Sequence, residues 1–355
     1  MSYRWGVLSG VVVKMNNITS PNVLVTGGLG YVGSHTCVAL HQAGYTPIIY
    51  DNLSNSSAAV AEQLARICGR RFDLIQAEVG DAQALKQCFA DYPIEAVLHF
   101  AALKAVGEST AQPLMYYQNN VCDSAILMKQ MHEAGIKRLV FSSSATVYGD
   151  PQYLPIDEDH SKAPTNPYGW SKLMVEQMMR DQCQAHSDDL SIALRYFNPV
   201  GAHESGLLGE NPTGIPNNLV PYVTQTAVGQ REKLHIYGND YDTPDGTGIR
   251  DYVHVMDLAE GHVQALGQLY SSNGFHAFNL GTGTGASVLD VVNTFEAVSG
   301  RAVPYSIAER RPGDVATTIA APTLAKARLN WQASRDLKQM LADSWHWQSK
   351  YPQGI

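Results

Sequence analysis

Tyr168 and Lys172 form a Tyr-x-x-x-Lys pair, a spacing that can serve proton transfer. On a helix, side chains four residues apart project from one face. A free tyrosine has a pKa of about 10 and is a poor base near neutral pH, but a neighbouring ammonium would lower that pKa. A hydroxyl of the serine run 142–144 could bond to a substrate oxygen. Tyr168, Lys172 and Ser144 are therefore the candidate catalytic residues, although such a pair alone is more often an exposed helix pair.

A glycine-rich turn that could hold a dinucleotide lies upstream. Residues 23–26 (VLVT) run directly into Gly27, Gly28, Gly30 and Gly33, and a helix-like segment follows. A pyrophosphate requires a tight strand-to-helix turn and exposed backbone N–H groups at a helix N-terminus. The alternative is a glycine turn without a ligand, but the flanking strand and helix favour a dinucleotide site.

An acidic residue indicates which dinucleotide binds. Asp51 ends the second predicted strand, where a carboxylate can accept both ribose hydroxyls. No basic residue lies among 52–56, so NAD is favoured over NADP. Small residues at 101 and 102, after the fourth predicted strand, would lie under the cofactor. The positive nicotinamide of oxidised NAD would add to the effect of Lys172 on the pKa of Tyr168.

The elements that must position these residues alternate between strands and helices. Such alternation implies right-handed crossovers and a parallel sheet with helices on both faces. The predicted fold class is α/β, a Rossmann-type doubly wound parallel sheet with a smaller C-terminal α/β substrate lobe. The predicted strands are 23–26, 47–50, 72–79, 96–100, 138–142 and 192–197, and the predicted helices are 31–43, 58–68, 83–92, 113–134 and 168–185.

Three segments are expected along the chain: an N-terminal extension at 1–21, an NAD-binding domain at 22–198 and a second domain at 199–355, parts of which return to the first. Residues 199–248 are rich in glycine, proline and asparagine, and helical periodicity returns at 255–269 and 288–298. The apolar run 5–13 is too short to span a bilayer. It could be a minimal signal-peptide core, a flexible extension, or sequence ahead of a true start at Met15.

Composition excludes several classes of protein. Of 355 residues, 45% are hydrophobic and 16% charged, which supports a large core and excludes a disordered or fibrous chain. A net charge of -8 argues against nucleic acid as a partner. The histidines show no short ligand spacing, so no metal site is expected. Five scattered cysteines and the lack of a run of transmembrane length indicate a soluble cytoplasmic protein without a membrane partner.

Longer stretches of sequence are more specific than either motif. They are 25–28 (VTGG), 99–109 (HFAALKAVGES), 141–149 (FSSSATVYG), 195–202 (RYFNPVGA), 214–219 (GIPNNL), 246–257 (GTGIRDYVHVMD) and 345–349 (WHWQS). Through them the chain resembles, from about residue 22 to 354, the extended short-chain dehydrogenase/reductase family, in its branch that epimerises UDP-hexoses at carbon 4. The resemblance implies reversible, NAD-dependent epimerisation through a transient 4-keto sugar in galactose metabolism.

The resemblance also implies roles for residues by position. Tyr168 would be the base at the sugar 4-hydroxyl, Lys172 its pKa partner and nicotinamide-ribose anchor, and Ser144 the hydrogen-bonding hydroxyl. Besides these three, the expected NAD contacts are Gly27, Gly30, Tyr31, Val32, Gly33, Asp51, Asn52, Leu53, Ser54, Asn55, Ser56, Glu78, Val79, Phe100, Ala101, Ala102, Leu103, Lys104, Asn119 and Phe197. Besides Ser144 and Tyr168, the expected UDP-hexose contacts are Lys104, Asn198, Asn218, Leu219, His235, Ile236, Tyr237, Arg250, Arg311, Asp314 and Thr318, with the two arginines as bidentate grips on the diphosphate.

Two positions bear on specificity. Where the family has a Gly-Asp step after the third strand, this chain has Glu78 and Val79, and Asp81 follows, so the adenine contact stays open between Glu78 and Asp81. At Thr318, family members restricted to glucose and galactose tend to carry tyrosine. Threonine leaves room for an acetamido group, so N-acetylated UDP-sugars are expected substrates, unless Tyr305 or Tyr237 fills the space.

Two other functions stay open, and the oligomeric state rests on the resemblance. A nucleotide-sugar 4,6-dehydratase needs a further acid and base, and Ala145 and Thr146 cannot serve as the acid. A non-catalytic NAD-sensing protein on the same fold would not need the Tyr168, Lys172 and Ser144 set. The resemblance implies a homodimer through helices within 113–134 and 168–185, whose apolar faces could equally cover their own sheet.

Overall fold

The computed structural model describes residues 20–212, 214–270, 272–311 and 313–355, and the expectations for residues 1–19 lie outside this part of the chain. Seven parallel strands form the larger sheet, in the order β10-β6-β5-β4-β1-β2-β3. The strands are β1 (Asn22–Thr26), β2 (Thr46–Asp51), β3 (Leu74–Gln76), β4 (Ile94–His99), β5 (Arg138–Ser144), β6 (Leu190–Tyr196) and β10 (Gly274–Leu280). The strand order reverses between β1 and β4, and ligands bind at the carboxyl ends of strands beside such a reversal.

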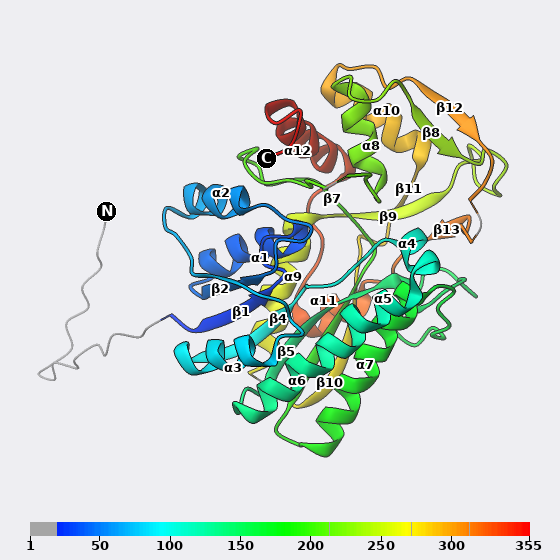
Figure 1. The fold of residues 1–355 in the computed structure, drawn as a ribbon. Helices are drawn as coiled ribbons and strands as arrows, with labels where there is room; N and C mark the ends of the chain where they lie inside the picture. The colour runs from blue at the N-terminus through cyan, green and yellow to red at the C-terminus, as the bar shows by residue number, and fades with distance from the viewer. Residues whose placement is uncertain (1–19, 213, 271, 312) are drawn as a thin grey trace, which may run out of the picture.

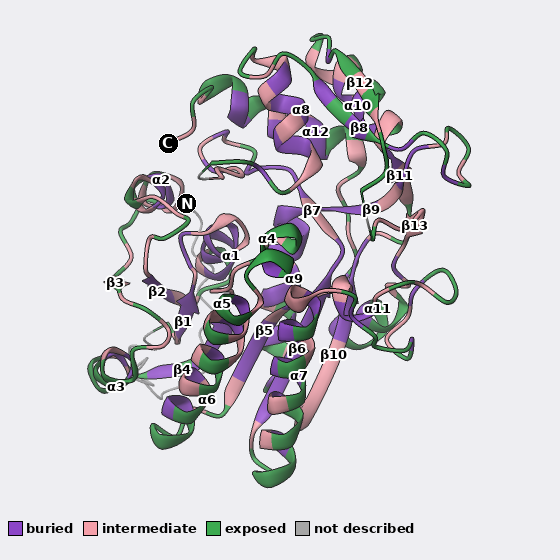
Figure 2. Ribbon diagram, turned by 45° about the vertical axis from the view of Figure 1, so that its right-hand side comes forward, coloured by how far each residue is buried: buried purple, intermediate pink, exposed green. Residues whose placement is uncertain are grey.

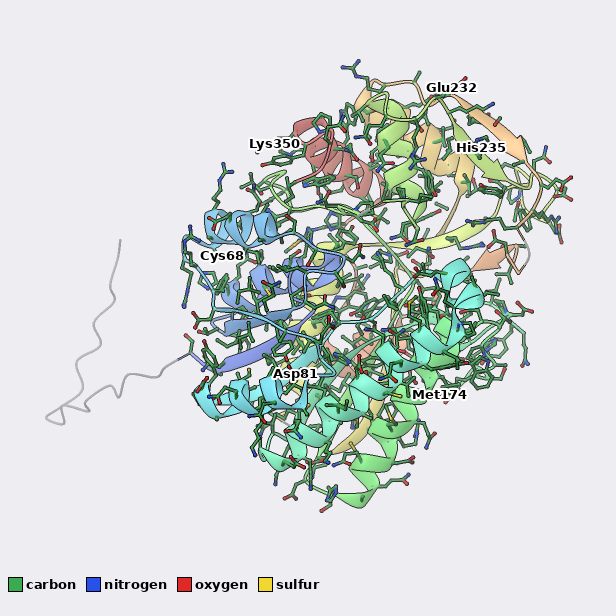
Figure 3. All side chains as sticks on the ribbon, viewed as in Figure 1. Cys68, Asp81, Met174, Glu232, His235 and Lys350 are labelled. Atoms are coloured by element: carbon green, nitrogen blue, oxygen red, sulfur yellow. The ribbon has the colours of Figure 1, made fainter. Side chains whose placement is uncertain are left out.

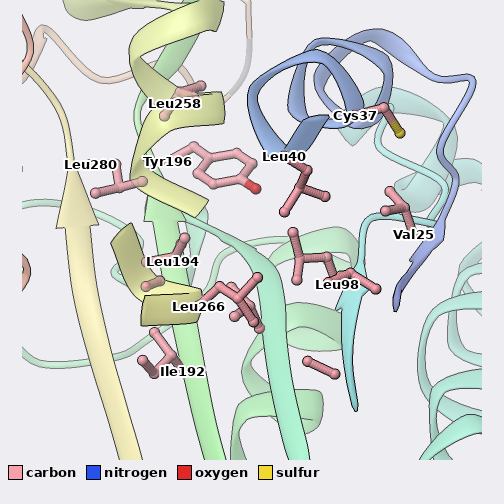
Figure 4. Packing of buried hydrophobic residues seen from close by; sticks show 14 of the residues in the cluster. Val25, Cys37, Leu40, Leu98, Ile192, Leu194, Tyr196, Leu258, Leu266 and Leu280 are labelled. Carbon is pink, nitrogen blue, oxygen red and sulfur yellow. The ribbon is translucent and has the colours of Figure 1, made fainter. Parts of the chain in front are cut away.

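Helices cover both faces of this sheet, which confirms the predicted doubly wound fold (Figure 1). One face carries α1 (Tyr31–Gln42), α2 (Ala58–Cys68), α9 (Val255–Gln268) and α11 (Thr323–Leu329), and the other carries α3 (Ala82–Asp91), α6 (Asp123–Glu133) and α7 (Pro167–Ala185). Because side chains alternate along a strand, Val23 and Val25 pack into the first core and Leu24 into the second. Figure 4 shows Val25 of β1 and Leu40 of α1 in the first core.

A smaller lobe lies beyond the carboxyl ends of the sheet. The chain enters it directly from β6, because β7, the first strand of this lobe, begins two residues after β6 ends. Strand β9 pairs with β7, β11 and β13, and β8 pairs with β12. Buried residues of α8, α10 and α12 give this lobe a core of its own, and Figure 2 shows buried segments in this lobe. Its elements are β7 (Asn198–Val200), α8 (Leu219–Ala227), β8 (Leu234–Tyr237), β9 (Ile249–His254), β11 (Gly285–Ser287), α10 (Val288–Ser299), β12 (Tyr305–Ala308), β13 (Thr317–Thr318) and α12 (Leu337–Lys350).

The helix predicted at 113–134 and the strand predicted at 72–79 differ from the structure. The single helix expected at 113–134 is three elements, α5 (Pro113–Tyr117), the π-helical turn η1 (Gln118–Cys122) and α6, and α4 (Val106–Ala111) precedes them. Strand β3 is shorter than the expected 72–79. Two elements of residues 199–355 belong to the larger domain, since β10 pairs with β6 and α9 packs on α1. Periodicity indicates that a segment has an apolar face, but it does not indicate which sheet or helix covers that face.

Candidate active site

The glycine turn after β1 leaves room only for backbone. Gly27 has a φ of +66°, and a Cβ there would lie 2.7 Å from the backbone nitrogen of Ala101. A Cβ on Gly33 would lie 2.2 Å from the carbonyl oxygen of Gly27, so helix and turn pack in contact. Gly30 is the N-cap of α1 and supplies no side-chain acceptor, which leaves first-turn N–H groups for an anion. This turn fits the pyrophosphate of a dinucleotide.

Asp51 organises the loop that follows β2. Its carboxylate is buried and accepts hydrogen bonds from the Leu29 N–H at 2.9 Å, the Leu53 N–H at 2.9 Å and the Ser56 hydroxyl at 2.8 Å. The acid therefore joins the glycine turn to residues 52–56 and lies where a ribose would meet both. Asn52 donates to the Glu78 carboxylate at 2.8 Å.

The two acids after β3 have different surroundings. Glu78 faces the loop after β2 through Asn52, and its carbonyl accepts a hydrogen bond from the Tyr50 hydroxyl. Asp81 is the N-cap of α3 and accepts from the backbone N–H groups of Gln83 and Ala84. The Asp81 carboxylate thus serves the helix, and the Glu78 side chain lies on the side of the Asp51 loop.

A buried asparagine that the sequence analysis missed fixes the loop after β4. Asn120 accepts from the Leu103 N–H and donates to the Leu103 carbonyl, both at 2.9 Å, and it also donates to the Ser171 hydroxyl at 3.0 Å. Loop 100–104 is thereby tied to α7. The expected NAD contact Asn119 is its neighbour in the π-helical turn, a feature common at functional sites.

Ser144, Tyr168 and Lys172 meet at the carboxyl end of β5. Ser144 is the last residue of β5, and Tyr168 and Lys172 lie one turn apart near the start of α7. The Lys172 ammonium nitrogen donates to the Ser142 carbonyl at 2.8 Å and lies 5.8 Å from the centre of the Tyr168 ring. The structure thus brings together the three residues expected to be catalytic.

Burial shifts the pKa values of Tyr168 and Lys172 in opposite directions. It raises the pKa of Tyr168, and a hydrogen bond with Ser144 offsets part of that rise. Burial lowers the pKa of Lys172 to about 7. The lysine alone therefore does not produce the expected low tyrosine pKa, because desolvation penalises the charged form of both groups.

A buried ion pair anchors the helix that carries Tyr168 and Lys172. Glu176, one turn further along α7, accepts from Arg195 of β6 at 2.6 Å and 3.0 Å, and from the Ser143 hydroxyl at 2.5 Å. Both side chains are almost fully buried. The sequence analysis missed this pair, although a charged residue inside the apolar strand β6 was a signal for it.

Most residues expected to hold UDP-hexose belong to the smaller lobe, but the Ile236 side chain is buried in the core of that lobe. The Arg311 guanidinium lies 4.9 Å from the centre of the Tyr237 ring and pairs with Asp314 at 2.8 Å. Arg250 on β9 is in register with Thr318 on the neighbouring strand β13. The other expected contacts are Asn198 on β7, Asn218 and Leu219 at the start of α8, and His235 and Ile236 on β8, where Figure 3 labels His235.

A cavity of about 670 Å³ lies elsewhere. Ile94, Lys137, Arg138, Asp188 and Tyr270 are among the residues that line it. They surround the amino ends of β4, β5 and β6, opposite the expected catalytic residues. Ligands of parallel α/β sheets bind at the carboxyl ends, so the site is placed there. In the described part of the chain, no group of three or more His, Cys, Asp or Glu residues could hold a metal ion.

A doubly wound sheet, a glycine turn after β1 and a Ser, Tyr and Lys set after β5 define an extended short-chain dehydrogenase/reductase. The sequence profile of a family described as GDP-mannose 4,6 dehydratase matches residues 24–344. The chain is 56% identical to UDP-glucose 4-epimerase of Bacillus subtilis (strain 168) over 332 residues. This alignment covers 94% of this chain and 98% of that protein.

Two solved structures are also similar. UDP-glucose 4-epimerase of Bifidobacterium longum, in complex with NAD+ and UDP, superposes with a TM-score of 0.91 at 48% identity over 94% of this chain and 100% of that one. The enzyme of Stenotrophomonas maltophila, with bound NAD and formylated UDP-arabinopyranose, gives a TM-score of 0.92 at 47% identity over 94% of this chain and 99% of that one. The chain belongs to the UDP-glucose 4-epimerase family of extended short-chain dehydrogenase/reductases.

Proposed function

We infer that this chain is an NAD-dependent isomerase that interconverts UDP-glucose and UDP-galactose by inverting carbon 4 of the hexose. The placement of Ser144, Tyr168 and Lys172 at the carboxyl end of β5 carries this conclusion, together with the similarity to UDP-glucose 4-epimerases along nearly the whole chain. The dehydratase alternative is disfavoured, because Ala145 and Thr146 after β5 offer no general acid.

In the proposed mechanism the Tyr168 phenolate removes the proton of the sugar 4-hydroxyl, and the Ser144 hydroxyl bonds to that oxygen. NAD, which the glycine turn after β1 and Asp51 would hold, would supply the hydride acceptor for carbon 4 and the hydride donor for its opposite face. Lys172 stabilises the phenolate and anchors the cofactor ribose. For the second half of the reaction, Tyr168 must return its proton to the carbonyl oxygen after the sugar has turned over.

We assign residues 22–198 to NAD and 199–355 to the UDP-sugar. Gly27, Gly33 and Asp51 support the first assignment, because a Cβ would fill the turn and the buried carboxylate lies at the end of β2. The stacked Arg311 and Tyr237 support the second, since a planar cation suits a diphosphate and a ring suits a uracil. The adenine contact is assigned to Glu78, because Asp81 caps α3.

The proposal extends to sugar specificity, assembly and compartment. Thr318 is proposed as a small gate residue that admits N-acetylated UDP-sugars. The chain is proposed to form a homodimer through α5 and α7, which carry exposed Leu114, Trp170 and Met174. A reducing cytoplasm is proposed because all five cysteines are free.

Turnover without added cofactor tests the proposed activity. Purified protein mixed with UDP-galactose is expected to form UDP-glucose, using NAD retained from expression. A keto-deoxy sugar product would indicate the dehydratase instead. Absence of turnover by protein that carries NAD would favour an NAD-sensing protein.

A further inference from the structure

His99 is the last residue of β4 and has no part in the proposed mechanism. Its side chain is buried, and both ring nitrogens form hydrogen bonds. Nδ1 lies 2.7 Å from the Thr26 hydroxyl, and Nε2 lies 2.8 Å from the Ser124 hydroxyl. Thr26 ends β1 directly before the glycine turn, and Ser124 lies in the first turn of α6. One imidazole therefore joins the turn that would hold NAD to a helix that packs on α7.

Beyond Ser124, a chain of hydrogen bonds continues to the backbone of Tyr168. The Ser124 hydroxyl donates to the Asn120 carbonyl at 2.6 Å. The Asn120 side-chain amide donates to the Ser171 hydroxyl at 3.0 Å, and that hydroxyl donates to the Tyr168 carbonyl at 2.7 Å. Ser124, Asn120 and Ser171 are each at most 3% exposed, so the chain is shielded from water.

The proton positions in this chain follow from the donors available. Ser124 gives its only hydroxyl proton to the Asn120 carbonyl, so it must accept from His99, and Nε2 carries the imidazole proton. Burial lowers the pKa of His99 to about 3, which leaves Nδ1 unprotonated, and Nδ1 therefore accepts from Thr26. Every group then donates in one direction, from Thr26 towards Tyr168. Aligned hydrogen bonds of this kind strengthen one another inside a protein.

The two ends of the chain hold two parts of the candidate active site. At one end, the Thr26 hydroxyl also accepts from the Ala101 backbone N–H at 3.5 Å, and Thr26 leads into Gly27. Gly27 and Ala101 are both expected NAD contacts. At the other end, the Tyr168 carbonyl belongs to the first turn of α7, so a shift of this carbonyl moves the phenol with it.

We propose that His99 is a positioning residue that holds the glycine turn and Tyr168 at a fixed separation. The hydride of carbon 4 and the proton of its hydroxyl leave the same sugar, so the groups that receive them must be placed with respect to each other. A misplacement of about 1 Å can lower a rate about 10²-fold. The inference rests on the proposed function, because it gives His99 a part in that reaction.

Kinetics with UDP-galactose, expressed per bound NAD, tests this role. His99→Leu breaks the chain and is expected to lower kcat about 10- to 100-fold. KM should stay within about threefold, because most expected UDP contacts belong to the smaller lobe. His99→Gln can accept from Thr26 and donate to Ser124, so it is expected to keep kcat within about threefold of the wild type.

His160→Leu is the matched control, because His160 is a fully buried histidine with two hydrogen bonds outside the chain. It is expected to lower the unfolding temperature and to leave kcat unchanged. A wild-type kcat in His99→Leu, or a loss that His99→Gln shares in full, would overturn the proposal. If His99→Leu does not fold, His99→Asn decides, because its side chain is too short to span Thr26 and Ser124 and kcat should fall as expected for leucine.

Amide hydrogen exchange separates this proposal from the proposed function. If the wild type does not turn over UDP-galactose, the proposed function fails, but the role of His99 can still be decided. In His99→Leu, residues 26–30 and 168–172 should both exchange about tenfold faster than in the wild type, and in His99→Gln both should exchange at the wild-type rate. Faster exchange at one end alone, or at neither, would show that His99 does not hold the two together.

Discussion

Tyr168 and Lys172 form a pair in which burial favours the neutral form of each residue. Burial raises the pKa of Tyr168 and lowers that of Lys172 to about 7. Ser144 opposes the rise in the tyrosine pKa through its hydrogen bond. In the proposed mechanism, the positive nicotinamide of oxidised NAD would favour the phenolate form of Tyr168.

Tyr168→Phe is expected to lower kcat by about 10²- to 10⁴-fold, because it removes the proton acceptor and keeps the ring. NAD should remain bound at the wild-type ratio. The control is Tyr153→Phe, which removes an exposed phenol outside the site and should leave kcat unchanged. Wild-type turnover by Tyr168→Phe would refute the assignment of the base.

Lys172 should make stability depend on pH in a defined direction. Its pKa in the folded protein is lowered from an ordinary 10.5 to about 7, so the cost of burying the amine is complete below pH 7 and is relieved as the pH rises towards 10.5. Relative to Lys172→Met, the nucleotide-free wild type should gain about 1.4 kcal/mol in free energy of unfolding per pH unit between pH 7 and 9. Denaturant titrations at several pH values measure this difference, and a constant difference would contradict the lowered pKa.

Thr318 is expected to set which sugars are accepted. The wild type should interconvert both the plain and the N-acetylated UDP-hexoses, whereas Thr318→Tyr should lose kcat/KM for the N-acetylated pair by about 100-fold and keep the plain pair. Thr318→Ser, which stays small, serves as the control and should accept both. If the tyrosine variant still accepts the N-acetylated sugars, another side chain limits the pocket.

At the scale of elements, α7 is held in register on the sheet by Glu176 and Arg195. Glu176→Gln leaves the arginine charge buried without its counter-ion and is expected to lower the free energy of unfolding by about 3–5 kcal/mol. Lys137→Ala is the control, because its pair with Asp188 is exposed and worth at most about 1 kcal/mol. Equal stability losses for the two variants would show that the buried pair does not anchor α7.

At the scale of the whole molecule, the neighbouring helices α5 and α7 both carry exposed apolar side chains. Leu114 is 81% exposed, and Trp170 and Met174, one turn apart on α7, are each 40% exposed; Figure 3 labels Met174. Helices α5 and α7 contact each other, so these side chains can meet a second copy together. This surface is the proposed dimer interface.

Trp170→Glu is expected to convert the proposed homodimer into monomers, because it places a charge among the exposed apolar side chains of α5 and α7. Light scattering of wild type and variant gives the masses. Ile307→Glu is the control, since Ile307 is exposed on β12 of the smaller lobe and should leave the dimer intact. A wild-type mass equal to that of one chain would exclude the proposed dimer.

The sequence by itself determined the features that depend on neighbours along the chain. The glycine turn, the acid at the end of β2 and the spacing of Tyr168 and Lys172 follow from local geometry, because a turn or a helix fixes the relative positions of residues a few places apart. The strand–helix alternation likewise determined the doubly wound sheet.

Only the tertiary structure decided which distant residues meet. Glu210 contacts Lys104, which lies 106 positions away in the sequence, and Glu176 of α7 contacts Arg195 of β6. No periodicity encodes such contacts, because they form only when the two lobes pack together and α7 packs on β6. The same reason applies to β10, which pairs with β6, and to α9, which packs on α1: an apolar face is visible in the sequence, but its partner is selected by packing in three dimensions.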